Sequence, residues 1–164
     1  LAASAAENIP LAYAKVGKTA DSEKAYEALL AHTTDPKKKA GLNLQVAQMK
    51  DQPGWMLLDV RARKLYTGEE GAWIRKGHIP GAINHPWSDD LTPAGAWKSK
   101  EELQAAYAAQ GVTPDKEIIT HCQLGIRAAH TWFVLKHVLG YPRVKNYDGS
   151  WQEWGNREDL PIER

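Results

Sequence analysis

The feature that most constrains this chain is a junction between an apolar strand and an amphipathic helix, with the single cysteine at the junction. Residues 117–120 read Glu-Ile-Ile-Thr, a short β-branched run typical of a buried strand, and apolar residues recur at helical spacing over residues 128–139. Cys122 therefore lies between a strand and a helix. In parallel α/β sheets this position faces the crevice at the carboxyl ends of the strands, where ligands bind.

The loop that holds Cys122 is suited to binding an anion. A glycine in it can take a positive φ angle, which would let several backbone N–H groups converge above the sulfur. These amides belong to Gln123, Leu124, Gly125 and Ile126. Together with the helix N-terminus and the charge of Arg127, they favour a thiolate over a thiol. The alternative is an ordinary buried thiol, but the glycine and arginine that follow favour a nucleophile.

The order of predicted elements indicates an α/β fold. Strand patterns at residues 55–60, 82–84, 117–120 and 143–147 alternate with helical patterns. One helix begins at a capping box, in which Ser99 and Glu102 would satisfy each other's backbone N–H groups, and should end at Gly111. Strands that alternate with helices predict a parallel sheet with helices on both faces.

Four stretches, in this order along the chain, resemble the rhodanese (thiosulfate sulfurtransferase) family. They are Leu57–Arg61, Gly77–Ala82, the cysteine loop Cys122–Ala128 and Val144–Trp154. The resemblance covers roughly residues 42–164. This part of the chain is similar to the catalytic C-terminal domain of tandem rhodaneses. It implies a rhodanese-like three-layer fold, with a mostly parallel sheet of five strands between helices, and a cysteine that forms a persulfide.

The domain division follows from the extent of these motifs. Residues 42–164 are expected to form the catalytic domain, and residues 1–41 a helical N-terminal extension or an interdomain linker. The opening stretch from Leu1 resembles a small-residue cleavage region but has no hydrophobic segment before it, and it equally suits a linker. The compartment, periplasmic or cytoplasmic, is left open, and a second rhodanese domain in a longer precursor is a possible partner.

Three residues outside the loop are candidates for substrate binding. Asp59 ends a predicted strand at the catalytic edge; it could orient groups near the cysteine, or bond backbone N–H groups and Arg61, which is the commoner role of such aspartates. In the family, a basic residue that helps to hold an anionic donor often precedes the aromatic residue after this strand. Leu65 stands there instead, with Arg63 nearby. Trp151 could line the crevice, close the core, or do both.

Composition narrows the partners and cofactors. The 21 Lys and Arg nearly balance the 20 Asp and Glu, so no global field favours nucleic acid or a membrane. One cysteine excludes an internal disulfide and a thiolate metal cluster. His130 and His137 share a helix face without a third ligand for zinc, so they are interpreted as packing or surface residues. His78 precedes a turn and is expected to bond neighbouring backbone. No metal or organic cofactor is expected.

Three functions remain in view. The leading one is an enzyme that moves a sulfane sulfur from a small anionic donor such as thiosulfate to cyanide or a thiol, through a persulfide on Cys122. The second is a non-catalytic sulfur carrier or partner-binding module. The third is a cysteine phosphatase, whose signature also runs from His-Cys to arginine; here only four residues separate Cys122 from Arg127, and the resulting smaller loop favours sulfur over a tetrahedral oxyanion.

Overall fold

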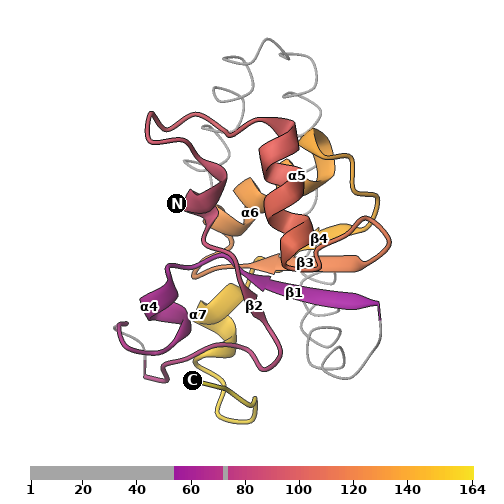
Figure 1. Ribbon diagram of the computed structural model, residues 1–164. Coiled ribbons are helices and arrows are strands. Elements are labelled where there is room, and N and C mark those ends of the chain that lie inside the picture. Colours follow the sequence, from indigo (N-terminus) through magenta and orange to yellow (C-terminus); the bar gives the residue numbers. More distant parts are fainter. Residues whose placement is uncertain (1–53, 72–73) are drawn as a thin grey trace.

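A parallel sheet organises residues 54–71 and 74–164, the part of the chain that the computed structural model describes (Figure 1). Its four strands lie in the order β2-β1-β3-β4, and all three pairings are parallel. The strands are β1 (Trp55–Asp59), β2 (Ile83–Asn84), β3 (Glu117–His121) and β4 (Val144–Asn146). The predicted α/β class is confirmed. Four strands match the four sequence patterns; the fifth strand that the resemblance implied is not among the described residues.

Helices cover both faces of the sheet. Figure 1 shows α5 and α6 on one side and α4 and α7 on the other. The helical elements are α4 (Arg63–Tyr66), the 3₁₀ turn η2 (Trp87–Asp90), α5 (Lys100–Ala109), α6 (Ile126–Phe133), the π-helical turn η3 (Val134–Val138) and α7 (Ser150–Trp154). The three layers place a separate apolar core on each face of the sheet.

Alternation along the central strands explains the two cores. Leu58 and Ile118 are fully buried in the core that α5 and α6 cover. Their strand neighbours Leu57 and Ile119 point the other way, into the core that contains Trp151 and α7. Successive strand side chains face opposite sides of a sheet, so a strand that is apolar at every position is buried on both.

The helices largely follow their sequence signals. The capping box at the start of α5 is present, with the Ser99 hydroxyl accepting from the Glu102 N–H and the Glu102 carboxylate accepting from the Ser99 N–H. The helix predicted to run from the cysteine loop to Leu139 departs from α geometry after Phe133. The Leu139 N–H donates to the Val134 carbonyl at 2.9 Å, a five-residue spacing that marks a π turn. The apolar pattern of the sequence does not reveal the change from α to π geometry, because apolar residues continue through the turn.

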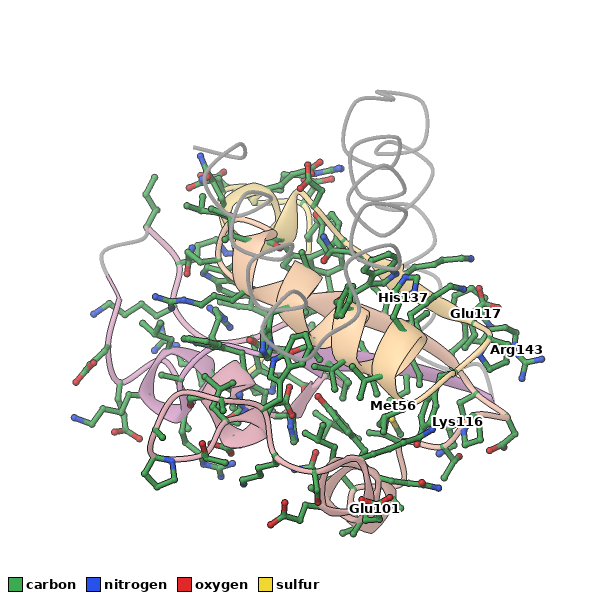
Figure 2. The ribbon with its side chains drawn as sticks, turned by 90° about the horizontal axis from the view of Figure 1, so that it is seen from above. Met56, Glu101, Lys116, Glu117, His137 and Arg143 are labelled. Carbon is green, nitrogen blue, oxygen red and sulfur yellow. The ribbon has the colours of Figure 1, made fainter. Side chains whose placement is uncertain are left out.

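Parallel pairing brings the ends of the strands to common edges. Asp59 lies opposite His121, and the Val60 N–H donates to the His121 carbonyl at 2.9 Å, so Cys122 begins just beyond the sheet at the carboxyl edge. Figure 2 labels Lys116, Glu117 and Arg143 at the opposite edge, where β3 and β4 begin. The domain division predicted at residues 41 and 42 lies outside the described residues. None of the described helices has the length and apolar character needed to cross a bilayer.

Candidate active site

Cys122 directly follows β3 and is 1% exposed, which places the thiol in the floor of the carboxyl edge. Its backbone is held by the start of α7. The Cys122 N–H donates to Ser150 Oγ at 3.1 Å, and the Cys122 carbonyl accepts from the Trp151 N–H at 3.0 Å. One residue on, the Gln123 carbonyl accepts from the Gln152 N–H at 3.0 Å. The cysteine therefore has a fixed backbone, which a nucleophile needs for oriented attack.

Gly125 makes the sharp turn into α6. Its φ angle is 83°, as the sequence predicted, and it is the N-cap residue of the helix without a side-chain cap. A side chain here would also collide, because a Cβ would lie 2.6 Å from Asp148 Oδ1 and 2.9 Å from the Asp148 carbonyl oxygen. The N–H groups in the first turn of an uncapped helix are open to an anion. The turn thus leaves donors beside the cysteine.

Ser150 is a site residue to which the sequence analysis assigned no role. Its φ angle of 50° is the only positive value at a non-glycine residue in the described ranges. The hydroxyl is fully buried; it accepts from the Cys122 N–H and donates to the Tyr147 carbonyl at 2.7 Å. Strained backbone of this kind persists where the surroundings hold it, often at functional sites. The Asp148-Gly149-Ser150 turn was the available sequence signal.

A buried charge cluster lies beneath the loop. Asp59 is fully buried, and its carboxylate accepts from the backbone N–H of Arg61 at 3.0 Å and from the guanidinium Nε at 2.9 and 3.0 Å. Arg61 Nη2 also donates to the Gly77 carbonyl at 2.7 Å, and the guanidinium lies 4.4 Å from the centre of the Trp151 ring. Arg61 therefore links Asp59 and Trp151 under the loop, because it bonds the carboxylate and lies over the indole ring. Neither the Asp59 nor the Trp151 side chain is open to solvent.

His121 joins this cluster to the cysteine. Its Nε2 lies 3.6 Å from Asp59 Oδ2, and its Nδ1 lies 3.4 Å from the Cys122 carbonyl oxygen. Burial lowers the pKa of His121 to about 4, against the opposing influence of Asp59 and with a further lowering by Arg61. The imidazole is therefore neutral at neutral pH. Its position fits packing under the loop and a hydrogen bond from Nδ1–H to the cysteine carbonyl.

The rim of the loop has a different character. Arg127 is exposed, and its guanidinium carbon lies 5.9 Å from the centre of the Trp87 ring. Leu124 is 41% exposed. Gln123 is partly exposed, but both of its amide atoms are buried and have no hydrogen-bond partner among the residues described. Ile126 is half-buried at the first position of α6.

Arg63 is the predicted site residue that the structure does not tie to the loop. It begins α4, is exposed, and its guanidinium carbon lies 6.0 Å from the centre of the Tyr66 ring. The predicted set thus divides into three. The loop residues and Arg127 surround the cysteine, Asp59 and Trp151 lie beneath it, and Arg63 stands on the surface of a neighbouring helix.

A second polar network, absent from the sequence analysis, lies on the α5 and α6 side. Asp90 is fully buried; its Oδ1 lies 3.0 Å from His85 Nε2, and its Oδ2 accepts from the Tyr107 hydroxyl at 2.8 Å. Burial alone lowers the pKa of His85, but its hydrogen bond to Asp90 and the charge of that carboxylate outweigh burial and raise the pKa above 6.5. His130 belongs to the same network, with Nδ1 3.7 Å from Asp90 Oδ2.

Neither network has its side chains arranged as a metal centre. In residues 54–71 and 74–164, no group of three or more His, Cys, Asp or Glu side chains is arranged to hold an ion. His78, which the sequence analysis expected to bond neighbouring backbone, stacks on Tyr66 at 3.8 Å between ring centres and has Nδ1 3.0 Å from the Tyr66 carbonyl oxygen. Its Nε2 lies 3.6 Å from Glu163 Oε2, so stacking, a backbone contact and this carboxylate hold the ring in place.

Comparison with known proteins assigns the family. A lone cysteine at the carboxyl edge of a parallel sheet, in a short loop that leads into a helix, defines a thiol-based α/β protein. The family model "Rhodanese-like domain" matches residues 43–157. This chain belongs to the rhodanese family.

Named relatives carry sulfur-transfer descriptions. A sulfur carrier protein TtuD from Thermus thermophilus is 49% identical over 126 residues, 71% of this chain and 44% of the relative. A thiosulfate sulfurtransferase from Corynebacterium glutamicum is 42% identical over 137 residues, 79% of this chain and 45% of the relative. The matches span less than half the length of these relatives. They support sulfur transfer as the general chemistry.

A solved structure supports the fold and adds a chemical precedent. EanB with ergothioneine covalently linked to a persulfide cysteine matches with a TM-score of 0.67 and 29% identity, over 73% of this chain and 30% of that one. The anaerobic ergothioneine biosynthesis enzyme from Chlorobium limicola, in complex with trimethyl histidine, matches with a TM-score of 0.67 and 28% identity, over the same shares of the two chains. The fold class is thus shared with solved rhodanese-like proteins.

Proposed function

We propose that this protein is a sulfurtransferase that carries a sulfane sulfur on Cys122 as a persulfide. The observation that carries the proposal is the setting of Cys122. Its backbone is hydrogen-bonded on both sides to the start of α7, and an uncapped helix begins four residues later. A fixed sulfur beside open N–H groups suits a reaction in which negative charge builds on sulfur. Membership of the rhodanese family and the names of the relatives support the same chemistry.

The transfer would proceed in two displacements at sulfur. The Cys122 thiolate attacks the outer sulfur of thiosulfate, a new S–S bond forms to Cys122, and the S–S bond of thiosulfate breaks as sulfite leaves with the electron pair. Cyanide or an acceptor thiolate then attacks the outer sulfur of the persulfide, and the Cys122 thiolate leaves. Loop amides stabilise the anionic sulfur in each step. The residues Gln123, Leu124, Gly125 and Ile126 supply that cradle.

A sulfur carrier is the second candidate. It is favoured by the Thermus thermophilus relative, whose name is that of a carrier. A carrier would form the same persulfide but release it only to a specific protein acceptor. The two candidates therefore share the loading step and differ in turnover with small acceptors.

Intact mass after incubation with thiosulfate or another sulfane donor tests the loading step. The protein should gain one sulfur, about 32 Da, and lose it to cyanide or a thiol. Cys122→Ser should gain nothing, because a serine hydroxyl is not ionised at neutral pH. Repeated turnover with cyanide supports the enzyme, and loading without turnover supports the carrier. Hydrolysis of an aryl phosphate that depends on Cys122, without any sulfur uptake, would replace both with a phosphatase.

We also propose that residues 42–164 are the catalytic domain and residues 1–41 an extension or linker. The family match from residue 43 supports this division. A chain without residues 1–41 should fold and take up sulfur on Cys122. Normal folding with loss of uptake would assign the extension to the active site. Joining a second rhodanese domain should likewise leave loading on Cys122 intact.

A further inference from the structure

The Arg127 guanidinium differs from that of Arg61 at the same edge of the sheet, because its N–H donors have no partner among the described residues. Among the described residues it forms no hydrogen bond and no ion pair. Its guanidinium carbon lies over the Trp87 ring, 5.9 Å from the ring centre. Its position at the end of the loop predicts hydrogen bonds to carbonyls or a carboxylate around the loop, and no such bond forms within residues 54–71 and 74–164. A guanidinium has five N–H donors in a planar fork. With one face against an indole, the fork remains available to an oxyanion.

Trp87 is attached to the floor of the cysteine loop. Its backbone N–H donates to the Val60 carbonyl at 3.1 Å, and the Val60 N–H donates to the carbonyl of His121, the residue before Cys122. The indole is therefore built onto the carboxyl edge beside the cysteine. It also meets the edge of His130 at 5.5 Å, with the ring planes at 81°. Since His130 follows Arg127 by nearly one turn of α6, the indole contacts that helix at two points.

Buried contacts hold this tryptophan in place. It begins η2, whose last residue is Asp90, and the buried carboxylate of Asp90 is bonded to Tyr107 on α5 and lies 3.0 Å from His85 Nε2. On the other side, His130 Nε2 accepts from the Trp97 indole N–H at 2.6 Å. Trp87 is half-buried and packs against the core under α5 and α6. A cation on an aromatic face that is packed in this way loses little freedom when it binds an anion.

We propose that Trp87 is a positioning residue: its ring holds the Arg127 guanidinium at the rim of the cysteine loop, where this cation meets the oxyanion end of the donor. The inference rests on the proposed function and deepens it by naming the residue that places the cation for an anionic donor. Arg127 attracts the oxyanion end of the donor, and Trp87 fixes where that end lies. The sulfane end then points to Cys122, as attack requires. Neither role needs a bond from Arg127 to the loop.

The test uses two alkylating agents that differ in charge and do not depend on sulfur transfer. Iodoacetate is anionic and iodoacetamide is neutral, and both alkylate a cysteine thiolate. The ratio of their rate constants should fall about tenfold in Arg127→Met and about threefold in Trp87→Leu, and by less in Trp87→Phe, which keeps an aromatic face for the guanidinium. The double variant Trp87→Leu/Arg127→Met should fall no further than Arg127→Met, because the tryptophan acts only through the arginine.

Trp55→Leu is the matched control. Trp55 begins β1, at the end of the strand opposite the cysteine, and its ring centre lies 5.2 Å from Lys145 Nζ. The variant therefore loses the same kind of cation–ring contact, but away from the cysteine. Its ratio should equal that of the wild type. Trp87→Phe retains an aromatic ring and the packing, and circular dichroism checks that each variant is folded. Unchanged ratios in Arg127→Met, or effects of the two single variants that add in the double variant, would overturn the proposal.

Kinetics of sulfur uptake connect this ratio to the donor. KM for thiosulfate should rise about tenfold in Arg127→Met and about threefold in Trp87→Leu, while uptake from an uncharged organic trisulfide should stay within about twofold. Equal losses for both donors would overturn the placing of this cation for an anionic donor. A wild-type protein that takes up no sulfur would instead overturn the proposed function, and the alkylation ratio would still report whether Trp87 acts through Arg127.

Discussion

Two arginines lie against tryptophan rings at the carboxyl edge of the sheet, and they differ in burial and in hydrogen-bond partners. Arg61 is 1% exposed, and its guanidinium lies 4.4 Å from the Trp151 ring centre while it bonds Asp59 and the Gly77 carbonyl. Arg127 is exposed and lies 5.9 Å from the Trp87 ring centre with its donors open. The guanidinium of Arg61 is occupied by partners within the fold, whereas that of Arg127 has no hydrogen-bond partner among the described residues.

The difference follows from the cost of burial. A buried guanidinium loses its hydration, so it requires a carboxylate and carbonyls as partners, and these partners leave nothing for a substrate. An exposed guanidinium remains hydrated and can exchange water for an anion. The same contact with an aromatic face therefore marks a structural residue in one place and a candidate binding residue in the other.

The largest expected effect is at the buried pair. Arg61→Met leaves the Asp59 carboxylate buried without its partner, and the free energy of unfolding should fall by about 3 to 5 kcal/mol. Urea denaturation measures this loss. The double variant Asp59→Asn/Arg61→Met removes both charges and should recover part of it. A single variant as stable as the wild type would show that the buried cluster does not hold the fold.

The next effect concerns the support of the cysteine from α7. Ser150→Ala deprives the buried Cys122 N–H of its 3.1 Å acceptor, and unfolding free energy should fall by about 1 to 3 kcal/mol. Ser150→Gly loses the same bond but relieves the positive φ angle, so its loss should be smaller. If the two variants are equally stable, backbone strain at this residue is negligible. Denaturant unfolding of both proteins checks the order.

Acid should weaken the buried cluster through His121. Its pKa is lowered to about 4 in the folded protein and has an ordinary value of 6.5 when unfolded, so the unfolded state binds the proton first as pH falls. This group should destabilise the fold by about 2 kcal/mol between pH 7 and pH 5, with little further loss below pH 4. His121→Asn removes the titrating group. Its unfolding free energy should therefore fall less over the same interval, and an identical pH dependence in both proteins would contradict the assignment.

The smallest effect on stability is expected at the exposed arginine. Arg127→Met should change the free energy of unfolding by less than about 0.5 kcal/mol, since no buried group loses a partner. The same variant should lose preference for anionic donors. A large loss of stability would place Arg127 with Arg61 as a structural residue and end the contrast between them.

Local patterns in the sequence determined most of the frame. The apolar run around Leu58 and the β-branched run around Ile118 form the central strands, and the Ser99 capping box begins α5. The cysteine loop turns at Gly125 with a positive φ angle. These features depend on neighbours in the chain, since strand alternation, capping and turn chemistry act over a few residues. The ordered motifs likewise indicated the family, which the family match confirms.

Tertiary structure decided which charges are buried and which are open. Arg61 and Arg127 are equivalent by residue type, and both lie against a tryptophan ring that is distant in the chain, 90 residues away for Arg61 and 40 for Arg127. Burial distinguishes them, because only Arg61 is enclosed with a carboxylate and a carbonyl as partners. The turn at Ser150 has a local signal, but its bond to the Cys122 N–H and the burial of Asp90 at the end of η2 do not. The hydration of a charged group and the geometry of its partners depend on long-range packing, so local sequence patterns do not determine them.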